Sequence, residues 1–375
     1  MSRVLPPELL AHILDHLAGP LHVPTDMRRY RKRQGALTRC CLVSRVFRDL
    51  AQARLAALVQ CARDEDVDAF KNALEQPHGK LLAERVRVFS ALGDPMHEGL
   101  PVDGFLPRLP KLDLVRIQGV ESEVFDEFFH DTSQVPHLIL DCVRIESPAF
   151  SFPLRLVSLS LYNVGIASGS LSSLLSSAFT PSLRALFMAD LVDAENDDEP
   201  FLPTLDSASV SRLDMIQLDM AGDDDLCTPL VNLAREVGTP VMLGTALMYH
   251  WAARGLAAEH VEHIQLQHTP YNFEDGFRSG VAGPIHAGAR PMPLLSCFVE
   301  AVKSWPNLRT LHLLPFLRTP ILPAESLLLR KSLMKLCREK GVEVFWLPEK
   351  EGDEYDLNRE FWTWARRRKE EGKGQ

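Results

Sequence analysis

The sequence lacks the features that mark most enzymes, secreted proteins and membrane proteins. No apolar run reaches 18 residues, and residues 1–30 lack the basic-then-apolar layout of a secretion signal, so we expect neither membrane spanning nor secretion. The motifs G-x-S-x-G, G-x-G-x-x-G and H-E-x-x-H are missing, as is a P-loop. We therefore expect no catalytic residue, no cofactor and no metal site.

Cysteine is scarce and scattered, and no charge of either sign dominates the chain. Seven cysteines form no C-x-x-C pair, which is typical of reduced thiols in a cytoplasmic or nuclear protein.

The 375 residues include 41 Lys or Arg against 50 Asp or Glu, a formal charge of −9, which disfavours nucleic acid as a partner. The acidic stretches 193–199 and 223–225 lack the spacing of a calcium loop and indicate solvated loops.

Two helical patterns occupy the first fifty residues. Pro6 and Pro7 suit a helix start, and the apolar residues that follow fall on one helical stripe: Leu9, Leu10, Ile13, Leu14 and Leu17. A second helical stretch covers 36–50. Neither stretch can bury its apolar face alone, which predicts a small helical module with surface left for a partner. The alternative is an ordinary helical hairpin that packs on its own domain.

A dense basic run, Met27–Arg33, lies between Gly19-Pro20 and Gly35. Because glycine and proline flank the run, we expect residues 19–35 to form a surface loop inserted between the two helices. The other interpretation of residues 28–33 is a nuclear-import or anion-contacting patch.

A degenerate L-x-x-L-x-L pattern begins near residue 105. Clear copies are 112–117, 156–161, 183–188, 213–218, 261–266 and 308–313. The repeat anchors are 18–34 residues apart, with one gap of 47, and this spacing resembles that of leucine-rich repeats. Helical patterns lie between most strands, at 122–131, 170–179, 226–237, 246–256, 293–305 and 325–340.

The predicted fold class is α/β: an N-terminal all-α module followed by an irregular leucine-rich-repeat-like solenoid of parallel strands. A compact α/β domain with a twisted parallel sheet is the alternative. In each strand the residue between the last two apolar positions should point outward. This rule selects a row on the concave face as the substrate-binding surface: Arg116, Ser160, Phe187, Gln217, Gln265 and His312.

Two further segments stand apart from the repeats. Residues 267–293 form a Gly/Pro-rich insertion with three aromatic residues, which indicates either a functional loop or a disordered one. For the tail, 351–375, we expect a short helix with a basic end, whose Phe361, Trp362 and Trp364 could cover the open end of a solenoid.

The first segment resembles an F-box. That family has a Leu-Pro-x-Glu-hydrophobic start, Ile and Leu along the first helix, and a later hydrophobic-Val-Ser-basic-x-aromatic stretch. The matching positions are Leu5, Pro6, Glu8, Leu9, Ile13, Leu17, Leu37, Leu42, Val43, Ser44, Arg45 and Phe47. The resemblance covers about residues 4–60. It departs from the family in the interruption at 19–35 and in Phe47, where Trp is commoner. Residues 82–88 resemble the short strand that starts the repeat region in fungal F-box proteins.

This resemblance implies a non-enzymatic substrate receptor of an SCF-type cullin–RING ubiquitin ligase. The F-box would dock onto a Skp-type adaptor, and through it onto the cullin–RING core, through apolar residues: Leu5, Pro6, Leu9, Ile13, Leu17, Leu42, Val43 and Phe47. The repeat domain would hold a substrate protein. We expect one copy of the chain in such a complex, no membrane and no nucleic acid, in the cytoplasm, the nucleus or both.

The corresponding domain boundaries are 1–62 for the F-box, 63–81 for a helical linker, 82–350 for the repeat domain and 351–375 for the tail. Two other classes remain open. One is a leucine-rich-repeat scaffold outside any ligase, in which the N-terminal hairpin only caps the solenoid. The other is an enzyme with a site in the 267–293 loop.

Overall fold

A computed structural model describes a large part of the chain. The described residues are 6–18, 27–92, 104–124, 126–145, 152–166, 168–194, 199–200, 202, 204–219, 224–243, 261–265, 291–313 and 324–346. They form two compact units: the first is 1–174 with 178–182 and 192–199, and the second is 175–177, 183–191 and 200–375. The predicted boundaries at 62, 81 and 350 stay predictions.

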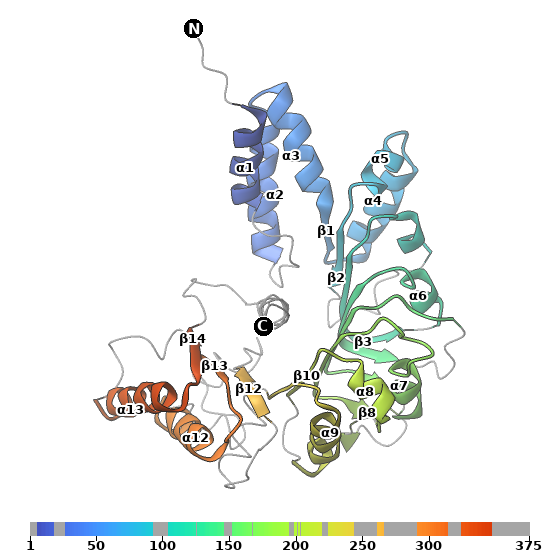
Figure 1. The fold of residues 1–375 in the computed structure, drawn as a ribbon. Helices are drawn as coiled ribbons and strands as arrows, with labels where there is room; N and C mark the ends of the chain where they lie inside the picture. Colours follow the sequence, from blue (N-terminus) through green and yellow to red (C-terminus); the bar gives the residue numbers. More distant parts are fainter. Residues whose placement is uncertain are drawn as a thin grey trace. The chain divides into compact units, whose positions relative to one another are not determined.

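The first unit begins with three helices, α1 (Pro7–Ala18), α2 (Met27–Cys41) and α3 (Arg45–Ala57) (Figure 1). The expected loop is therefore wrong for residues 27–35, which form the first half of α2. Long unbranched Arg and Lys side chains favour a helix, and Leu37 of the same helix is fully buried. The helix predicted over 36–50 is interrupted, because Ser44 ends the connection and its hydroxyl accepts a hydrogen bond from the Phe47 N–H as an N-cap.

The three helices share one apolar core. Its buried members come from all three helices: Leu14, Ala18, Leu37 and Ala51. Cys40, Cys41, Phe47, Leu50 and Leu55 pack against them. Burying one face of each helix in this way stabilises a bundle of helices that would be marginal alone.

A parallel sheet follows directly from α3. Strand β1 (Leu58–Cys61) begins at the residue after that helix and pairs with β2 (Val88–Leu92); β3 (Leu114–Val124), β4 (His137–Ile145) and β5 (Ser158–Tyr162) follow in order. Between the strands lie α4 (Asp64–Glu75), α5 (Gly79–Ala83), the 3-10 helix η1 (Leu106–Arg108), α6 (Asp126–Asp131) and α7 (Ser168–Leu174). The strand expected at 82–88 is wrong, because residues 79–83 are helical and β2 starts at Val88.

The second unit repeats the alternation of parallel strands and helices. Its strands are β7 (Ala185–Ala189), β10 (Met215–Asp219), β11 (Val241–Leu243), β12 (Val261–Gln265), β13 (Thr310–Leu313) and β14 (Glu343–Trp346), each paired in parallel with the next. Helices α8 (Ser207–Ser211), α9 (Asp224–Val237), α12 (Pro291–Ser304) and α13 (Ala324–Lys340) lie between them along the chain. In the first unit, the short strands β6 (Gly165–Ile166) and β8 (Val192–Asp193) pair beside the main ladder, and β9 (Glu199–Pro200), at the boundary of the two units, pairs with β8. The helix predicted at 246–256, loop 267–290 and the tail lie outside the described residues.

Three successive repeats share one backbone turn, at Cys142 within β4 and at Asn163 and Asp190 directly after β5 and β7. Cys142, Asn163 and Asp190 have φ values of 52°, 48° and 46°, a left-handed conformation in which Asn and Asp are the least strained residues after Gly. Each occupies the same place in an 11-residue unit: 135–145, 156–166 and 183–193. The repeated turn extends the L-x-x-L-x-L pattern by five residues. It shows that these three 11-residue repeats are equivalent in structure as well as in sequence.

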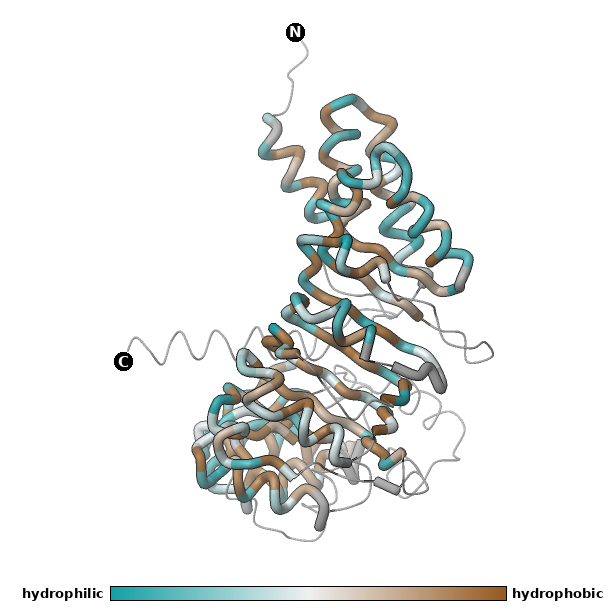
Figure 2. The backbone as a smooth tube through the Cα atoms, turned by 90° about the vertical axis from the view of Figure 1, so that its right-hand side faces the viewer, coloured by the Kyte–Doolittle hydropathy of each residue, from teal (hydrophilic) through white to brown (hydrophobic). Residues whose placement is uncertain are grey.

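Several strands of the sheet are buried on both faces. Every residue of β7, β11 and β13 is buried, with no alternation of buried and exposed positions. Hydrophobic residues predominate along the strands, with polar residues among them (Figure 2). Parallel sheets in α/β proteins behave in this way because both faces are covered. The predicted α/β class with parallel strands is confirmed.

Candidate functional site: an exposed apolar surface on the N-terminal helices

Large apolar side chains are concentrated on the surface of the N-terminal helices. Six of the nine large exposed apolar residues in the described part of the chain lie within residues 9–46, and they are 43–79% exposed: Leu9, Ile13, Leu17, Leu42, Val43 and Val46. We call these six residues the apolar surface. A concentration of this kind on a soluble domain marks an interaction site more often than chance exposure does.

Helix α1 places half of these residues by presenting two apolar faces. Leu10 and Leu14 are buried and pack inward, whereas Leu9, Ile13 and Leu17 repeat at every fourth position on the outer side. The single stripe that the sequence suggested is therefore divided. One face builds the helical core, and the other remains available to a partner.

The connection between α2 and α3 places the other half. Leu42 and Val43 are the most exposed of the six, at 79% and 66%, and the N-cap at Ser44 fixes the turn that carries them. Val46 lies in the first turn of α3. Val46 was not among the predicted contact residues, although its position three residues after Val43 could have indicated it.

Most predicted adaptor-contacting residues lie on or beside this surface. Pro6, Leu9, Ile13, Leu17, Leu42 and Val43 are exposed, while Leu5 lies outside the described residues. Phe47 differs, because it is half-buried and packs against the core around Leu14 and Leu37. Its main contribution is to hold α3 on the other two helices.

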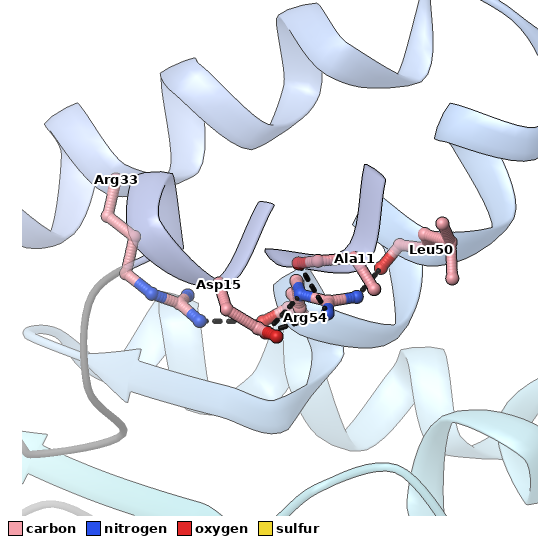
Figure 3. A network of polar contacts seen from close by, with 5 residues as sticks. All are labelled: Ala11, Asp15, Arg33, Leu50 and Arg54. Atoms are coloured by element: carbon pink, nitrogen blue, oxygen red, sulfur yellow. Dashed lines mark hydrogen bonds and ion pairs between the residues drawn. The ribbon is translucent and has the colours of Figure 1, made fainter. Parts of the chain in front are cut away.

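Two arginines fix the three helices to one another (Figure 3). The Arg54 side chain reaches from α3 to α1, donating to the Ala11 carbonyl at 3.1 Å and to Asp15 Oδ1 at 2.7 Å. Arg33, the last residue of the basic run, donates to the carbonyls of Ala18 at 3.0 Å and Arg54 at 2.7 Å. Ala18 and Arg54 lie in the last turns of α1 and α3, where carbonyls lack intrahelical partners. Arg33 therefore has a structural role inside the bundle, and burial lowers the pKa of its guanidinium.

The same basic helix joins the bundle to the edge of the sheet. Tyr30 packs against Leu58 and Val88, and its hydroxyl is hydrogen-bonded to the backbone of Gln60. Gln34 Nε2 donates to the Leu58 carbonyl at 3.4 Å. Burial raises the pKa of Tyr30. Side chains of α2 thus cover the outer strand β1 of the first unit, whose unpaired backbone groups could otherwise pair with another chain.

The residues predicted for the concave face are placed differently from the expectation. Five of them are buried: Arg116, Ser160, Phe187, Gln217 and His312. The side chain of Gln265 lies outside what the structure describes. The expectation of a solvent-facing row is therefore wrong for these five, because both faces of the sheet are covered, and their predicted role in substrate binding stays a prediction.

Several buried polar groups nevertheless line one face of the first unit's sheet. Arg116 donates to Asp141 Oδ2 at 3.0 Å and to Gln118 Oε1 at 2.9 Å. In register beside it lie Ser90 on β2 and Gln60 on β1. The Ser90 hydroxyl and both amide atoms of Gln60 are buried without a hydrogen-bond partner in the described structure. Neither residue was predicted from the sequence, because no strand was assigned to 58–61 and the neighbouring strand was expected at 82–88, short of Ser90.

In the second unit, burial controls the protonation of a predicted site residue. The ring of His312 stacks on Phe345, with centroids 4.9 Å apart. Burial lowers the pKa of His312 to about 4, so the imidazole is neutral at physiological pH. The neutral ring suits a packed sheet position better than a charged contact to a substrate.

Within the described ranges no group of His, Cys, Asp and Glu side chains could hold a metal ion. No described helix is long and apolar enough to cross a membrane. None of the seven cysteines takes part in a disulfide, and burial raises the pKa of the Cys61 and Cys142 thiols to about 12. A scan against protein-family models matches no family, and a search of curated proteins finds no significant match.

Proposed function

We propose that the chain is a substrate-recognition subunit of an SCF-type cullin–RING ubiquitin ligase. In this proposal the helices α1–α3 are an F-box that docks onto a Skp-type adaptor, and the repeats form a leucine-rich-repeat-like domain that binds a substrate protein. The observation that carries the proposal is the exposure of the apolar surface. Five of its six residues lie at positions where the F-box resemblance implies contact with the adaptor: Leu9, Ile13, Leu17, Leu42 and Val43.

The energetics of the apolar surface support docking. A large aliphatic side chain that passes from water into an interface contributes about 1.5–3 kcal/mol when fully buried. The core of the bundle is already complete without these residues, since Leu14, Leu37 and Ala51 are fully buried. Exposing six large side chains beside a complete core does not stabilise the fold. A partner that covers these side chains would gain the free energy of their burial.

The connection between bundle and sheet supports a receptor that holds its substrate at a fixed position. Strand β1 starts at the residue after α3, and Tyr30 and Gln34 tie α2 to that strand. A substrate held on a short, stiff connection reacts as if at high local concentration. Ubiquitin transfer would then depend on proximity, with no catalytic residue needed in this chain.

The proposal is tested by co-expressing the full chain with a Skp-type adaptor and analysing the mixture by size-exclusion chromatography. We expect the wild-type chain to co-elute with the adaptor and the double variant Ile13→Asp with Val43→Asp to elute alone. Circular dichroism should show both chains equally folded, because both positions are exposed. A folded double variant that binds the adaptor with unchanged affinity would contradict the proposal.

A further inference from the structure

The helices that carry the apolar surface are strongly basic in a chain that is acidic overall. Residues 27–57, which contain α2 and α3, include nine Lys or Arg residues and a single carboxylate, Asp49. The whole chain has a formal charge of −9. A local excess of this size, confined to two adjacent helices, produces a field that acts on the approach of a charged partner.

Structure divides these cations into an internal and an external set. Arg33 and Arg54 hold the bundle together, as described above. By contrast, Arg31, Lys32, Arg39, Arg45 and Arg48 are exposed. Within the described part of the chain none of these five forms an ion pair, whereas the partly exposed Arg87 and Arg108 of the same unit lie beside Asp113 and Glu75.

Three of the exposed cations surround the most exposed part of the apolar surface. Arg39 lies one turn before Leu42, and Arg45 lies two residues after Val43. Arg48 donates from Nε to the Cys41 carbonyl at 3.2 Å, which holds its guanidinium at the end of α2, next to Leu42. The tip of the bundle is thus an apolar centre with three arginines at its rim.

We propose that this tip binds an acidic protein surface: an apolar groove that has carboxylates opposite Arg39, Arg45 and Arg48. The inference rests on the proposed function for the identity of the partner, and it adds the chemistry that the partner's groove must carry. Interfaces commonly join an apolar centre to a charged rim. Exposed Leu42, Val43 and Val46 at the centre match a protein groove, whereas the backbone of a nucleic acid offers phosphates and no apolar seat for them.

Rim charges act mainly on the association rate and on its salt dependence. At low ionic strength the arginines should accelerate binding, and at about 1 M salt, where the Debye length is about 3 Å, the acceleration should vanish. The apolar contacts should depend much less on salt. The contributions of the rim charges and of the apolar contacts to binding can therefore be separated by measuring the association rate at two salt concentrations.

The test measures association of the full chain with the Skp-type adaptor by stopped-flow fluorescence. The rim variant carries Arg39→Glu, Arg45→Glu and Arg48→Glu, and the control carries Arg155→Glu, Lys331→Glu and Arg338→Glu, three exposed cations elsewhere. Both variants have the same net charge. At low salt we expect the rim variant to associate about tenfold or more slowly than wild type and the control less than about threefold, with all three rates converging at high salt.

Equal rates for the rim variant and the control would overturn the inference and leave the proposed function standing. If the wild-type chain does not bind the adaptor at all, the proposed function fails, and a poly-glutamate peptide then tests the tip by itself. Binding of that peptide by wild type and control, with loss in the rim variant, would sustain an acidic protein partner. The inference of an acidic protein partner would be overturned if the wild-type chain does not bind the peptide, or if it binds a single-stranded RNA of equal charge more strongly.

Discussion

The N-terminal helices and the strands of the sheet differ in which side chains they expose and which they bury. The helices leave six large aliphatic residues exposed, although they have enough apolar residues for a complete core. The sheet buries almost everything, including Arg116, Gln217 and His312. Exposed apolar groups and buried polar groups are each costly. The difference indicates that the helices present their surface to a partner, while the polar residues of the sheet are part of its packed interior.

The sharpest contrast lies within one helix, between neighbouring residues of α1. Leu14 is fully buried in the helical core, and Ile13 is 43% exposed. Leu14→Ala should lower the free energy of unfolding by about 2–5 kcal/mol because it leaves a cavity. Ile13→Ala should cost less than about 1 kcal/mol. Urea denaturation of the two variants measures both values, and equal losses would mean that Ile13 belongs to the core.

The buried ion pair of the sheet gives the next largest effect. Asp141→Ala removes the carboxylate from buried Arg116 and should cost about 3 kcal/mol of stability. Asp113→Ala breaks the pair with Arg87 at a half-exposed site and should cost less than about 1 kcal/mol. Replacing the buried pair together, by Arg116→Met with Asp141→Leu, should recover most of the loss. No recovery would indicate that the charges serve more than packing.

A buried imidazole makes the stability of the second unit depend on pH. The pKa of His312 is lowered by burial from 6.5 to about 4, so between these values the unfolded chain binds more protons than the folded chain. Stability is therefore complete above pH 6.5 and falls as the pH decreases toward 4. Between pH 7 and pH 5 the loss from this group should be about 2 kcal/mol. His312→Phe should remove that part of the pH dependence, and an unchanged pH profile would show that the ring is accessible to protons.

The smallest expected effect concerns a polar side chain with no partner. Gln217 is completely buried, and neither of its amide atoms has a hydrogen-bond partner in the described structure. Gln217→Leu should raise the free energy of unfolding by about 1 kcal/mol, because the cost of desolvating the amide disappears. Gln118→Leu is the matched control and should destabilise, since Gln118 accepts from Arg116. A loss of stability in Gln217→Leu would mean that its amide is hydrogen-bonded in solution.

Most of the longer strands from β3 onward and most of the described helices could be predicted from the sequence, because leucine spacing and helical periodicity are local signals. The L-x-x-L-x-L copies at 156–161 and 308–313 became β5 and β13, and the helical linker predicted over 63–81 became α4 and most of α5. The sequence misled where tertiary packing overrides local preference. Gly35 suggested a loop, yet it lies inside α2, where packing of Leu37 and Tyr30 offsets the cost of a helical glycine.

The candidate site was predictable in part for the same reason. Spacing along α1 identified Leu9, Ile13 and Leu17 but could not say which apolar residues face outward, since that depends on where α2 and α3 pack. Residues 58–61 fell inside the all-helical module predicted over 1–62, so β1 was not predicted, and with it Gln60. The period-2 rule could not reveal that the residues between the last two apolar positions of a strand are buried as well, because that depends on what covers the sheet.

Hydrogen exchange of the full chain, with and without a Skp-type adaptor, tests the central claim most directly. The account predicts that the adaptor protects amides in residues 7–18 and 39–48, around the apolar surface, and leaves β10, β11 and β13 unchanged. Protection confined to the sheet strands, or no protection at adaptor concentrations far above those of the chain, would contradict the claim that the N-terminal helices form the docking surface.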